Sequence, residues 1–133
     1  MVKSAHISKA KEALPELRKA KGSIVSVSSG AVDMSLAAWG AYSSSKSAVN
    51  SLSRHLAVEE PDITAVAIEP GLMDTDMQAT IRSEGKGHMS QEQHDVFVGF
   101  LDQGALGKPE KPGNVIATFV AEPLKALSGK FLS

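Results

Sequence analysis

Apolar residues recur along the chain at helical and at strand spacing, and the two spacings alternate. The first helical stripe consists of Ile7, Ala10, Leu14 and Leu17. This stripe predicts an amphipathic helix from Ile7 to Ala20, which Gly22 ends. The short β-branched run Ser23–Ser28, between a glycine and a polar turn, predicts a buried or half-buried strand. A loop is expected from there to Asp33.

A longer helix and a second strand follow. The helical stripe consists of Ala48, Leu52 and Leu56. It predicts a helix from Trp39 to Glu60, which stops before Pro61 because the residue that precedes a proline avoids helical geometry. Thr64–Ile68 has the composition of a strand, and Pro70-Gly71 turns the chain immediately afterwards.

The remaining residues predict three helices and a last strand. Met73–Ser83 and Gln91–Gln103 are expected as short helices, separated by the glycine-bearing segment Glu84–Met89. Such a segment is typical of a lid or a substrate-facing insertion. Gly113–Glu122 has helical spacing, and Gly129–Leu132 is long enough for an edge strand.

This order of elements indicates the fold class. Helix, strand, helix, strand, helices and strand alternate, which favours parallel strands joined by helical crossovers in an α/β layered sheet. A length of 133 residues, of which 42% are hydrophobic, predicts one compact unit over residues 1–133.

Composition narrows the classes of partner. The 14 basic and 15 acidic residues leave a formal net charge of −1, which argues against a site for nucleic acid or an anionic membrane. A small neutral or mildly charged molecule is the expected ligand. The chain has no cysteine, which excludes disulfides, and no apolar run of the roughly 20 residues that a membrane span requires. A cytoplasmic protein is expected.

Three polar side chains converge on one predicted cleft. Tyr42 and Lys46 are four residues apart on a helix and share one face, where the ammonium group favours the phenolate. Ser29 ends a strand thirteen residues before Tyr42, and Pro70-Gly71 ends the next strand. Ligands of open α/β sheets bind at the carboxyl ends of strands, so these residues bound one candidate site.

The motifs resemble those of a known family. Gly22–Gly30 (GSIVSVSSG), Ala41–Val49 (AYSSSKSAV) and Pro70–Met77 (PGLMDTDM) are similar, in order and spacing, to three segments of short-chain dehydrogenases/reductases. These are the catalytic-serine strand, the Tyr-x-x-x-Lys helix and the Pro-Gly segment. The flanking residues resemble the fungal branch related to sepiapterin and benzil reductases. The resemblance implies a partial Rossmann-like, three-layer parallel sheet, the C-terminal half of a doubly wound NAD(P)-binding fold.

The resemblance also implies a reaction, the NAD(P)-dependent reduction of a carbonyl or oxidation of the alcohol. Tyr42 would be the general acid and base, Lys46 would assist it and hold the nicotinamide ribose, and Ser29 would bind the substrate oxygen. The cofactor-binding residues implied are Tyr42, Lys46, Pro70, Gly71, Met73 and Thr75. NADP or NAD is the expected cofactor, with NADP favoured, and the partner is a small carbonyl substrate.

Two family features lack a counterpart in these residues. The Gly-rich loop that receives the pyrophosphate has no match, and the family's asparagine would fall at or just before Val2. We therefore expect the Gly-rich half to precede this chain and the cofactor site within it to be incomplete. The family commonly pairs through the helices that correspond to 7–20 and 39–60, so a homo-oligomer or association with a family member is expected.

Three other interpretations are open. The chain could be a non-catalytic remnant or a pairing module for a complete family member. Ser43-x-x-Lys46 fits the S-x-x-K signature of serine acyl-transfer enzymes, but their S-D-N and K-T-G partners are missing.

A further cluster contains His88, Glu92, His94 and Asp95. Its spacing matches no standard metal motif, so we interpret it as an exposed helix face and expect no metal.

Overall fold

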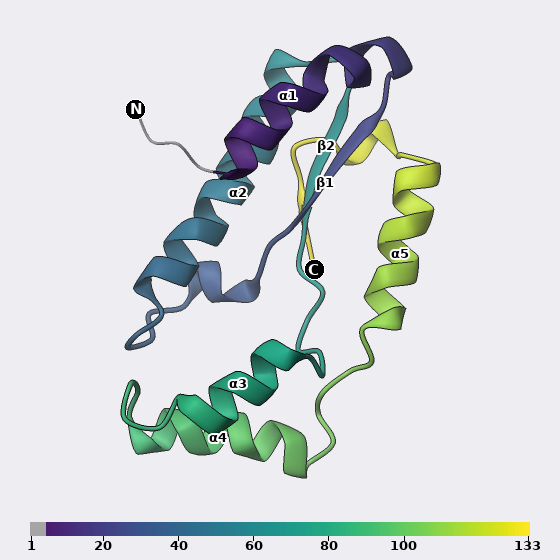
Figure 1. The fold of residues 1–133 in the computed structure, drawn as a ribbon. Helices are drawn as coiled ribbons and strands as arrows, with labels where there is room; N and C mark the ends of the chain where they lie inside the picture. Colours follow the sequence, from purple (N-terminus) through teal and green to yellow (C-terminus); the bar gives the residue numbers. More distant parts are fainter. Residues whose placement is uncertain (1–4) are drawn as a thin grey trace.

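The computed structural model describes residues 5–133, and its helices and strands alternate as predicted (Figure 1). The first four elements are α1 (Ala5–Ala20), β1 (Ser23–Val27), α2 (Gly40–Glu59) and β2 (Thr64–Ile68). The next four are α3 (Asp76–Glu84), α4 (Gln91–Asp102), α5 (Glu110–Ala121) and β3 (Phe131–Leu132). Two short 3₁₀ helices cover Gly30–Asp33 and Lys125–Leu127. The predicted bounds of β2 are confirmed at both ends.

Several predicted boundaries differ from the structure. The β1 strand ends at Val27 instead of Ser28, and β3 begins at Phe131 instead of Gly129. The α5 helix begins at Glu110 instead of Gly113.

Two further differences lie just after strand ends. Gly30–Asp33 was expected to be part of a loop and is a 3₁₀ turn, whose first free amides are bound by side chains. The α3 helix begins at Asp76 instead of Met73. Met73 forms a parallel bridge with Gly107, and the Asp74 amide donates to the Gly107 carbonyl, so these residues are held in an extended segment.

The sheet has three parallel strands in the order β1-β2-β3. All five residues of β2 are buried, because β1 pairs along the whole strand and helices cover both of its faces. The α1 and α2 helices cover one face of the sheet and α5 covers the other (Figure 1). This arrangement of three layers is the predicted partial Rossmann-like α/β fold.

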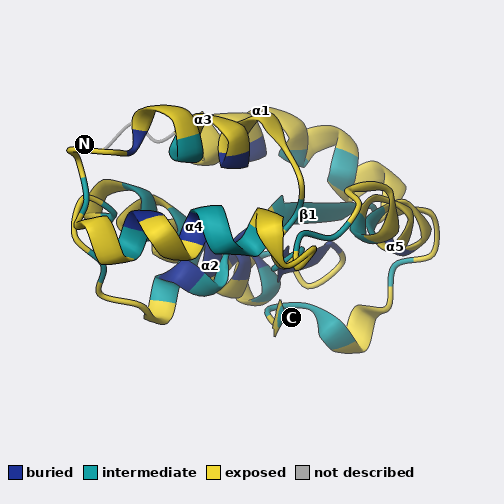
Figure 2. Ribbon diagram, turned by 90° about the horizontal axis from the view of Figure 1, so that it is seen from below, coloured by how far each residue is buried: buried dark blue, intermediate teal, exposed yellow. Residues whose placement is uncertain are grey.

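Alternate residues of the strands face two separate cores. On the α1/α2 face, Ala65 packs with Ala10 and Leu56. On the α5 face, Val66 packs with Phe119. Phe119 is the one buried residue of α5, and the rest of this helix is coloured mostly as exposed in Figure 2. The pleat of β2 therefore assigns neighbouring residues to opposite layers.

The buried stripe of α2 differs from the predicted one. The residues of α2 that the structure buries are Val49, Asn50, Ser53 and Leu56. Leu56 was predicted correctly, but Ala48 is exposed. Leu52 also packs against the core as predicted. The larger Val49 is buried in place of Ala48, because burial of its additional methyl groups is more favourable.

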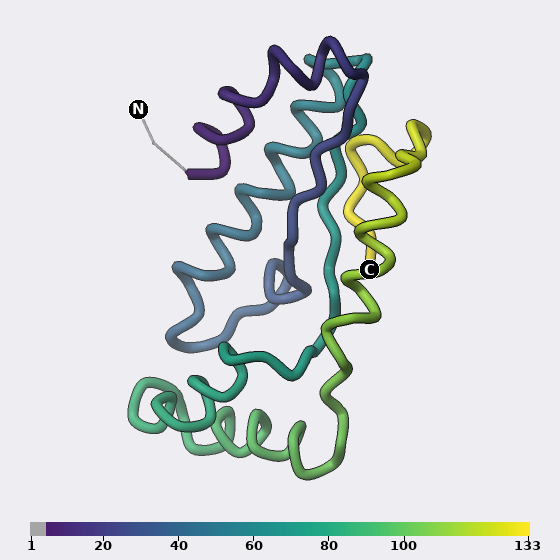
Figure 3. Tube along the Cα trace, turned by 45° about the vertical axis from the view of Figure 1, so that its right-hand side comes forward, coloured from purple at the N-terminus to yellow at the C-terminus, as the bar shows by residue number. Residues whose placement is uncertain are grey.

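The α3 and α4 helices form a pair that lies across the carboxyl ends of the strands. The chain leaves β2, passes through this pair and returns along α5, as the trace shows (Figure 3). The two helices pack on each other. The α3–α4 pair covers the space beyond the carboxyl ends of β1 and β2. None of the helices in residues 5–133 is long and apolar enough to cross a membrane.

An ion pair between α1 and the end of α2 gives a testable pH dependence. Arg18 Nε donates to Glu60 Oε2 at 2.8 Å, and the guanidinium makes a second hydrogen bond to the same carboxylate. Hydrogen bonding to Arg18, followed by its charge, holds the pKa of Glu60 below its usual value. The stabilisation is therefore present above the ordinary glutamate pKa and is lost as the pH falls through the lower, folded-state pKa.

We expect Arg18→Met to lower the melting temperature at pH 7. The difference in melting temperature from the wild type is expected to narrow as the pH falls through the lowered pKa of Glu60. Thermal melts at several pH values measure this. Lys19→Met is the matched control, because Lys19 forms only an exposed pair with Glu16 within α1. A difference between Arg18→Met and the wild type that is independent of pH would contradict the ion-pair account.

Candidate active site

A cleft of about 900 Å³ opens between the carboxyl ends of β1 and β2, the start of α2 and the α3–α4 pair. It brings together all the residues that the sequence predicted for the site. Those residues are Ser29, Tyr42, Lys46, Pro70, Gly71, Met73 and Thr75. The carboxyl end of a parallel sheet is where α/β proteins bind ligands, so this cleft is the candidate active site.

Ser29 begins the 3₁₀ turn that follows β1, and its hydroxyl group is already used as an acceptor. Ser29 Oγ accepts a hydrogen bond from the Ala31 amide at 3.2 Å. A hydroxyl group has one proton to donate besides its acceptor positions, so the proton of Ser29 is available to a ligand oxygen. The neighbouring Ser28 lies just beyond the strand and is buried, whereas Ser29 is half-exposed toward the cleft.

The first two turns of α2 carry Tyr42 and Lys46 to the same side of the cleft. Lys46 Nζ donates to the Val27 carbonyl at 2.8 Å and lies 5.7 Å from the centre of the Tyr42 ring. The end of β1 thus fixes the ammonium group beside the phenol. A positive charge there stabilises negative charge that develops on the phenol oxygen during proton transfer.

The segment after β2 forms another wall of the cleft. Gly71 has a φ of +83°, a conformation that favours glycine, and the backbone there carries no side chain. Thr75 is the residue before α3 but makes no capping hydrogen bond with its side chain. Its hydroxyl group is therefore available to a ligand, as is the open backbone at Gly71.

Sequence reasoning missed the aromatic wall of the cleft. Trp39 stacks on Phe97 of α4, with ring centres 5.4 Å apart and an angle of 3° between the planes. Trp39 also meets Tyr42 edge to face at 5.3 Å, and Phe97 meets Phe100 in the same way at 5.9 Å. These rings join the start of α2 to α4. The available signal was two pairs of aromatic residues at three-residue spacing, each pair within one predicted helix.

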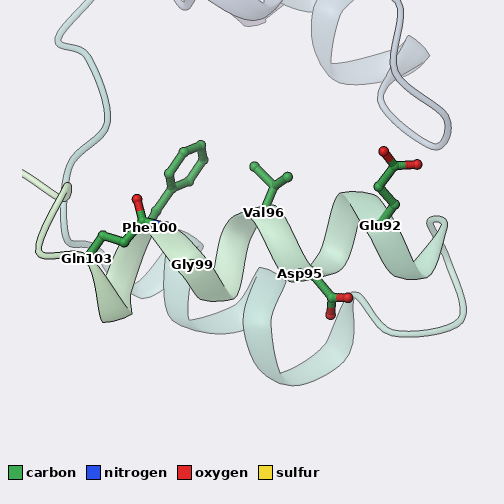
Figure 4. A pocket seen from close by; sticks show the side chains of 6 residues that line it. All are labelled: Glu92, Asp95, Val96, Gly99, Phe100 and Gln103. Carbon is green, nitrogen blue, oxygen red and sulfur yellow. The ribbon is translucent and has the colours of Figure 1, made fainter.

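One face of α4 carries a second, shallower hollow of about 590 Å³ (Figure 4). Val96 and Phe100 project from the same side of the helix in this view, and both also line the main cleft. Asp95 projects elsewhere and accepts a hydrogen bond from Gln91. The hollow and the cleft therefore adjoin at Val96 and Phe100.

The structure corrects the interpretation of the histidine cluster. His94 was expected on an exposed helix face and is buried, with its Nε2 atom 2.9 Å from the Arg82 carbonyl. His94 thereby ties α4 to α3, a contact that its polar neighbours in the sequence concealed. Within residues 5–133, no group of three or more His, Asp or Glu side chains is arranged to hold a metal ion.

Comparisons with known proteins identify the family of the chain. The family model for short chain dehydrogenases matches residues 3–86. An uncharacterized oxidoreductase of Saccharomyces cerevisiae is 42% identical over 123 residues, which cover 91% of this chain and 48% of that protein. A benzil reductase, (S)-benzoin forming, of the same yeast is 36% identical over 115 residues, which cover 84% of this chain and 44% of that protein.

A crystal structure of a short-chain dehydrogenase/reductase from Saccharomyces cerevisiae has the same fold. It superposes with a TM-score of 0.92 at 40% identity, and the match covers 96% of this chain and 51% of the other. The chain spans about half the length of the curated relatives that it matches. Family model, relatives and fold agree: the chain belongs to the short-chain dehydrogenases, a family of NAD(P)-dependent oxidoreductases.

Proposed function

We propose that the protein reduces the carbonyl group of an apolar ketone by hydride transfer, with NADP(H) as the preferred cofactor. The observation that carries this proposal is the meeting of Ser29, Tyr42 and Lys46 in one cleft beside the Pro70-Gly71 wall. The three side chains come from two elements, and the Lys46 contact with Val27 joins those elements. The alternative S-x-x-K chemistry is disfavoured by membership of the dehydrogenase family.

The residues present fit the nicotinamide end of the cofactor. Lys46 offers an ammonium group for ribose hydroxyls, Thr75 offers a hydroxyl free of capping, and Gly71 allows close approach of the backbone. Pro70 and Met73 complete this wall of the cleft. A bound reduced nicotinamide supplies the hydride that the carbonyl carbon receives.

The protein's own residues then handle the charge on the carbonyl oxygen. The Ser29 hydroxyl donates a hydrogen bond to that oxygen, where negative charge develops in the transition state. The Tyr42 hydroxyl transfers its proton to the same oxygen and completes the alcohol. Lys46 stabilises the phenolate that remains. In the oxidation direction Tyr42 accepts the proton again.

The lining of the cleft supports an aromatic substrate. Trp39, Phe97 and Phe100 present ring faces and edges beside Tyr42, and such surfaces favour planar apolar groups. The relative named as a benzil reductase is consistent with this class. We therefore propose an aryl ketone or diketone as the substrate class.

We expect Trp39→Leu to raise KM for benzil about tenfold, because the stacking surface is lost while apolar bulk is kept. KM for cyclohexanone is expected to change less. Steady-state oxidation of NADPH and of NADH measures both the proposed reaction and this effect. Val58→Ala, at an exposed position on the same helix, is the control. Equal effects of Trp39→Leu on both ketones would contradict an aromatic substrate site.

A second candidate function is a non-catalytic pairing module for a complete family member. We propose instead that residues 1–133 form one unit of an NAD(P)-binding domain, whose pyrophosphate site requires a Gly-rich βαβ unit outside these residues. We also propose that α1 and α2 pair with a second copy or with another family member. We propose that the active form of the protein includes such a Gly-rich unit, and activity is to be measured in that form.

A further inference from the structure

We propose that Glu69 is a positioning residue that holds Ser29 in place for the reaction, an inference that rests on the proposed function. Glu69 directly follows β2, and Ser29 lies just beyond the end of β1. The Glu69 Oε1 atom accepts a hydrogen bond from the Gly30 amide at 2.8 Å. This contact links the ends of two neighbouring strands immediately beside the serine.

The side chains of Glu69 and Ser29 each accept a hydrogen bond from one of the first two amides of the 3₁₀ turn. The Gly30 amide binds Glu69, and the Ala31 amide binds Ser29 Oγ at 3.2 Å. A hydrogen bond to a charged acceptor is stronger than one between neutral groups, so Glu69 makes the firmer of the two attachments. Without it, the turn can shift and the Ser29 hydroxyl moves with it.

The contact between Glu69 and Gly30 leaves no room for a side chain at position 30. A Cβ atom added to Gly30 would lie 2.4 Å from Glu69 Oε1. The crowded atom is the end of a flexible side chain, so an alanine at position 30 displaces the carboxylate and leaves the strands in place. The hydrogen bond can therefore be broken from either partner.

The charge of Glu69 has no fixed counterion in the described part of the chain. The ion pairs recorded for residues 5–133 do not include Glu69, and the nearby cation of Lys46 donates to the Val27 carbonyl. The role of the carboxylate is thus to accept the Gly30 hydrogen bond. A carboxamide at this position has an oxygen that can do the same.

The first test compares variants at both ends of the hydrogen bond. Glu69→Ala and Gly30→Ala are each expected to lower kcat about tenfold with little change in KM, as displacement of a reacting group does. Glu69→Gln should restore most of the activity. Glu122→Ala and Gly40→Ala are matched controls at exposed positions, and the latter adds a Cβ that meets nothing within 4 Å. Loss of activity in Glu69→Gln equal to that in Glu69→Ala would overturn the proposal.

Double variants test whether the effect passes through Ser29. In a Ser29→Ala background, Glu69→Ala is expected to cause no further loss, because the group that it positions is absent. Adding Gly30→Ala to Glu69→Ala should likewise cost nothing more. Full additivity with Ser29→Ala would show that Glu69 acts elsewhere and would overturn the positioning role.

A readout independent of catalysis is the exchange rate of the Gly30 amide hydrogen, measured by NMR. Glu69→Ala should accelerate this exchange, while Glu69→Gln should preserve its protection. Unchanged exchange in Glu69→Ala would overturn the proposed contact. Failure of the proposed function would appear differently, as wild-type activity in Ser29→Ala, so the two failures are distinguishable.

Discussion

Tyr42→Phe is expected to lower kcat for ketone reduction by about a thousandfold, because a positioned general acid contributes roughly 10²–10⁴-fold to such reactions. The substitution removes only the phenol oxygen. The ring that meets Trp39 edge to face at 5.3 Å remains, so the aromatic wall and the start of α2 are expected to keep their packing. Steady-state and single-turnover oxidation of the reduced cofactor measure the loss.

The melting temperature and the cofactor affinity of Tyr42→Phe serve as controls. Both should stay near the wild-type values, because the substitution removes a single hydroxyl group. An enzyme that retained most of its activity without this hydroxyl would require another proton donor in the cleft, and the assignment of Tyr42 would be wrong.

Lys46→Met is expected to reduce turnover about a hundredfold and to weaken cofactor binding about tenfold at the same time. The reason is that one ammonium group is proposed to have two roles, to stabilise the Tyr42 phenolate and to hold the nicotinamide ribose. Methionine keeps an apolar stem of similar length on α2. The variant also loses the hydrogen bond from Lys46 to the Val27 carbonyl, so a thermal melt accompanies the assay.

Calorimetric titration with NADPH and NADH separates the two roles of Lys46. A fall in turnover with unchanged cofactor affinity would contradict its contact with the ribose. Lys11→Met, on the exposed side of α1, is the control for loss of a positive charge. It should leave both turnover and affinity at wild-type values.

Local sequence signals were sufficient to predict that each of the three strands exists, and they gave both bounds of β2 correctly. The β2 strand was predicted at its observed bounds because Thr64–Ile68 is a compact β-rich run between Pro61 and Pro70. Tyr42 and Lys46 share a helix face at a spacing that the sequence states directly. Their arrival in one cleft with Ser29 follows from the parallel order of the strands.

Contacts between distant segments could not be predicted in this way. Trp39 and Phe97 stack although 58 positions separate them (97 − 39 = 58), and no periodicity within either helix specifies that pairing. The bond between Glu69 and Gly30 joins two strand ends 39 residues apart. The α3 helix begins at Asp76 instead of the predicted Met73, and this difference also comes from a contact between distant segments. The bridge from Met73 to Gly107 holds Met73 in an extended conformation.

The central claim is that this cleft directs a hydride to a carbonyl carbon. The most direct measurement uses NADPH or NADH that carries deuterium at both C4 positions, incubated with benzil and the protein that includes the Gly-rich unit. Mass spectrometry should find one deuterium on the carbinol carbon of the alcohol, with product formation lost in Tyr42→Phe. An alcohol without deuterium, or equal product from Tyr42→Phe, would contradict the account.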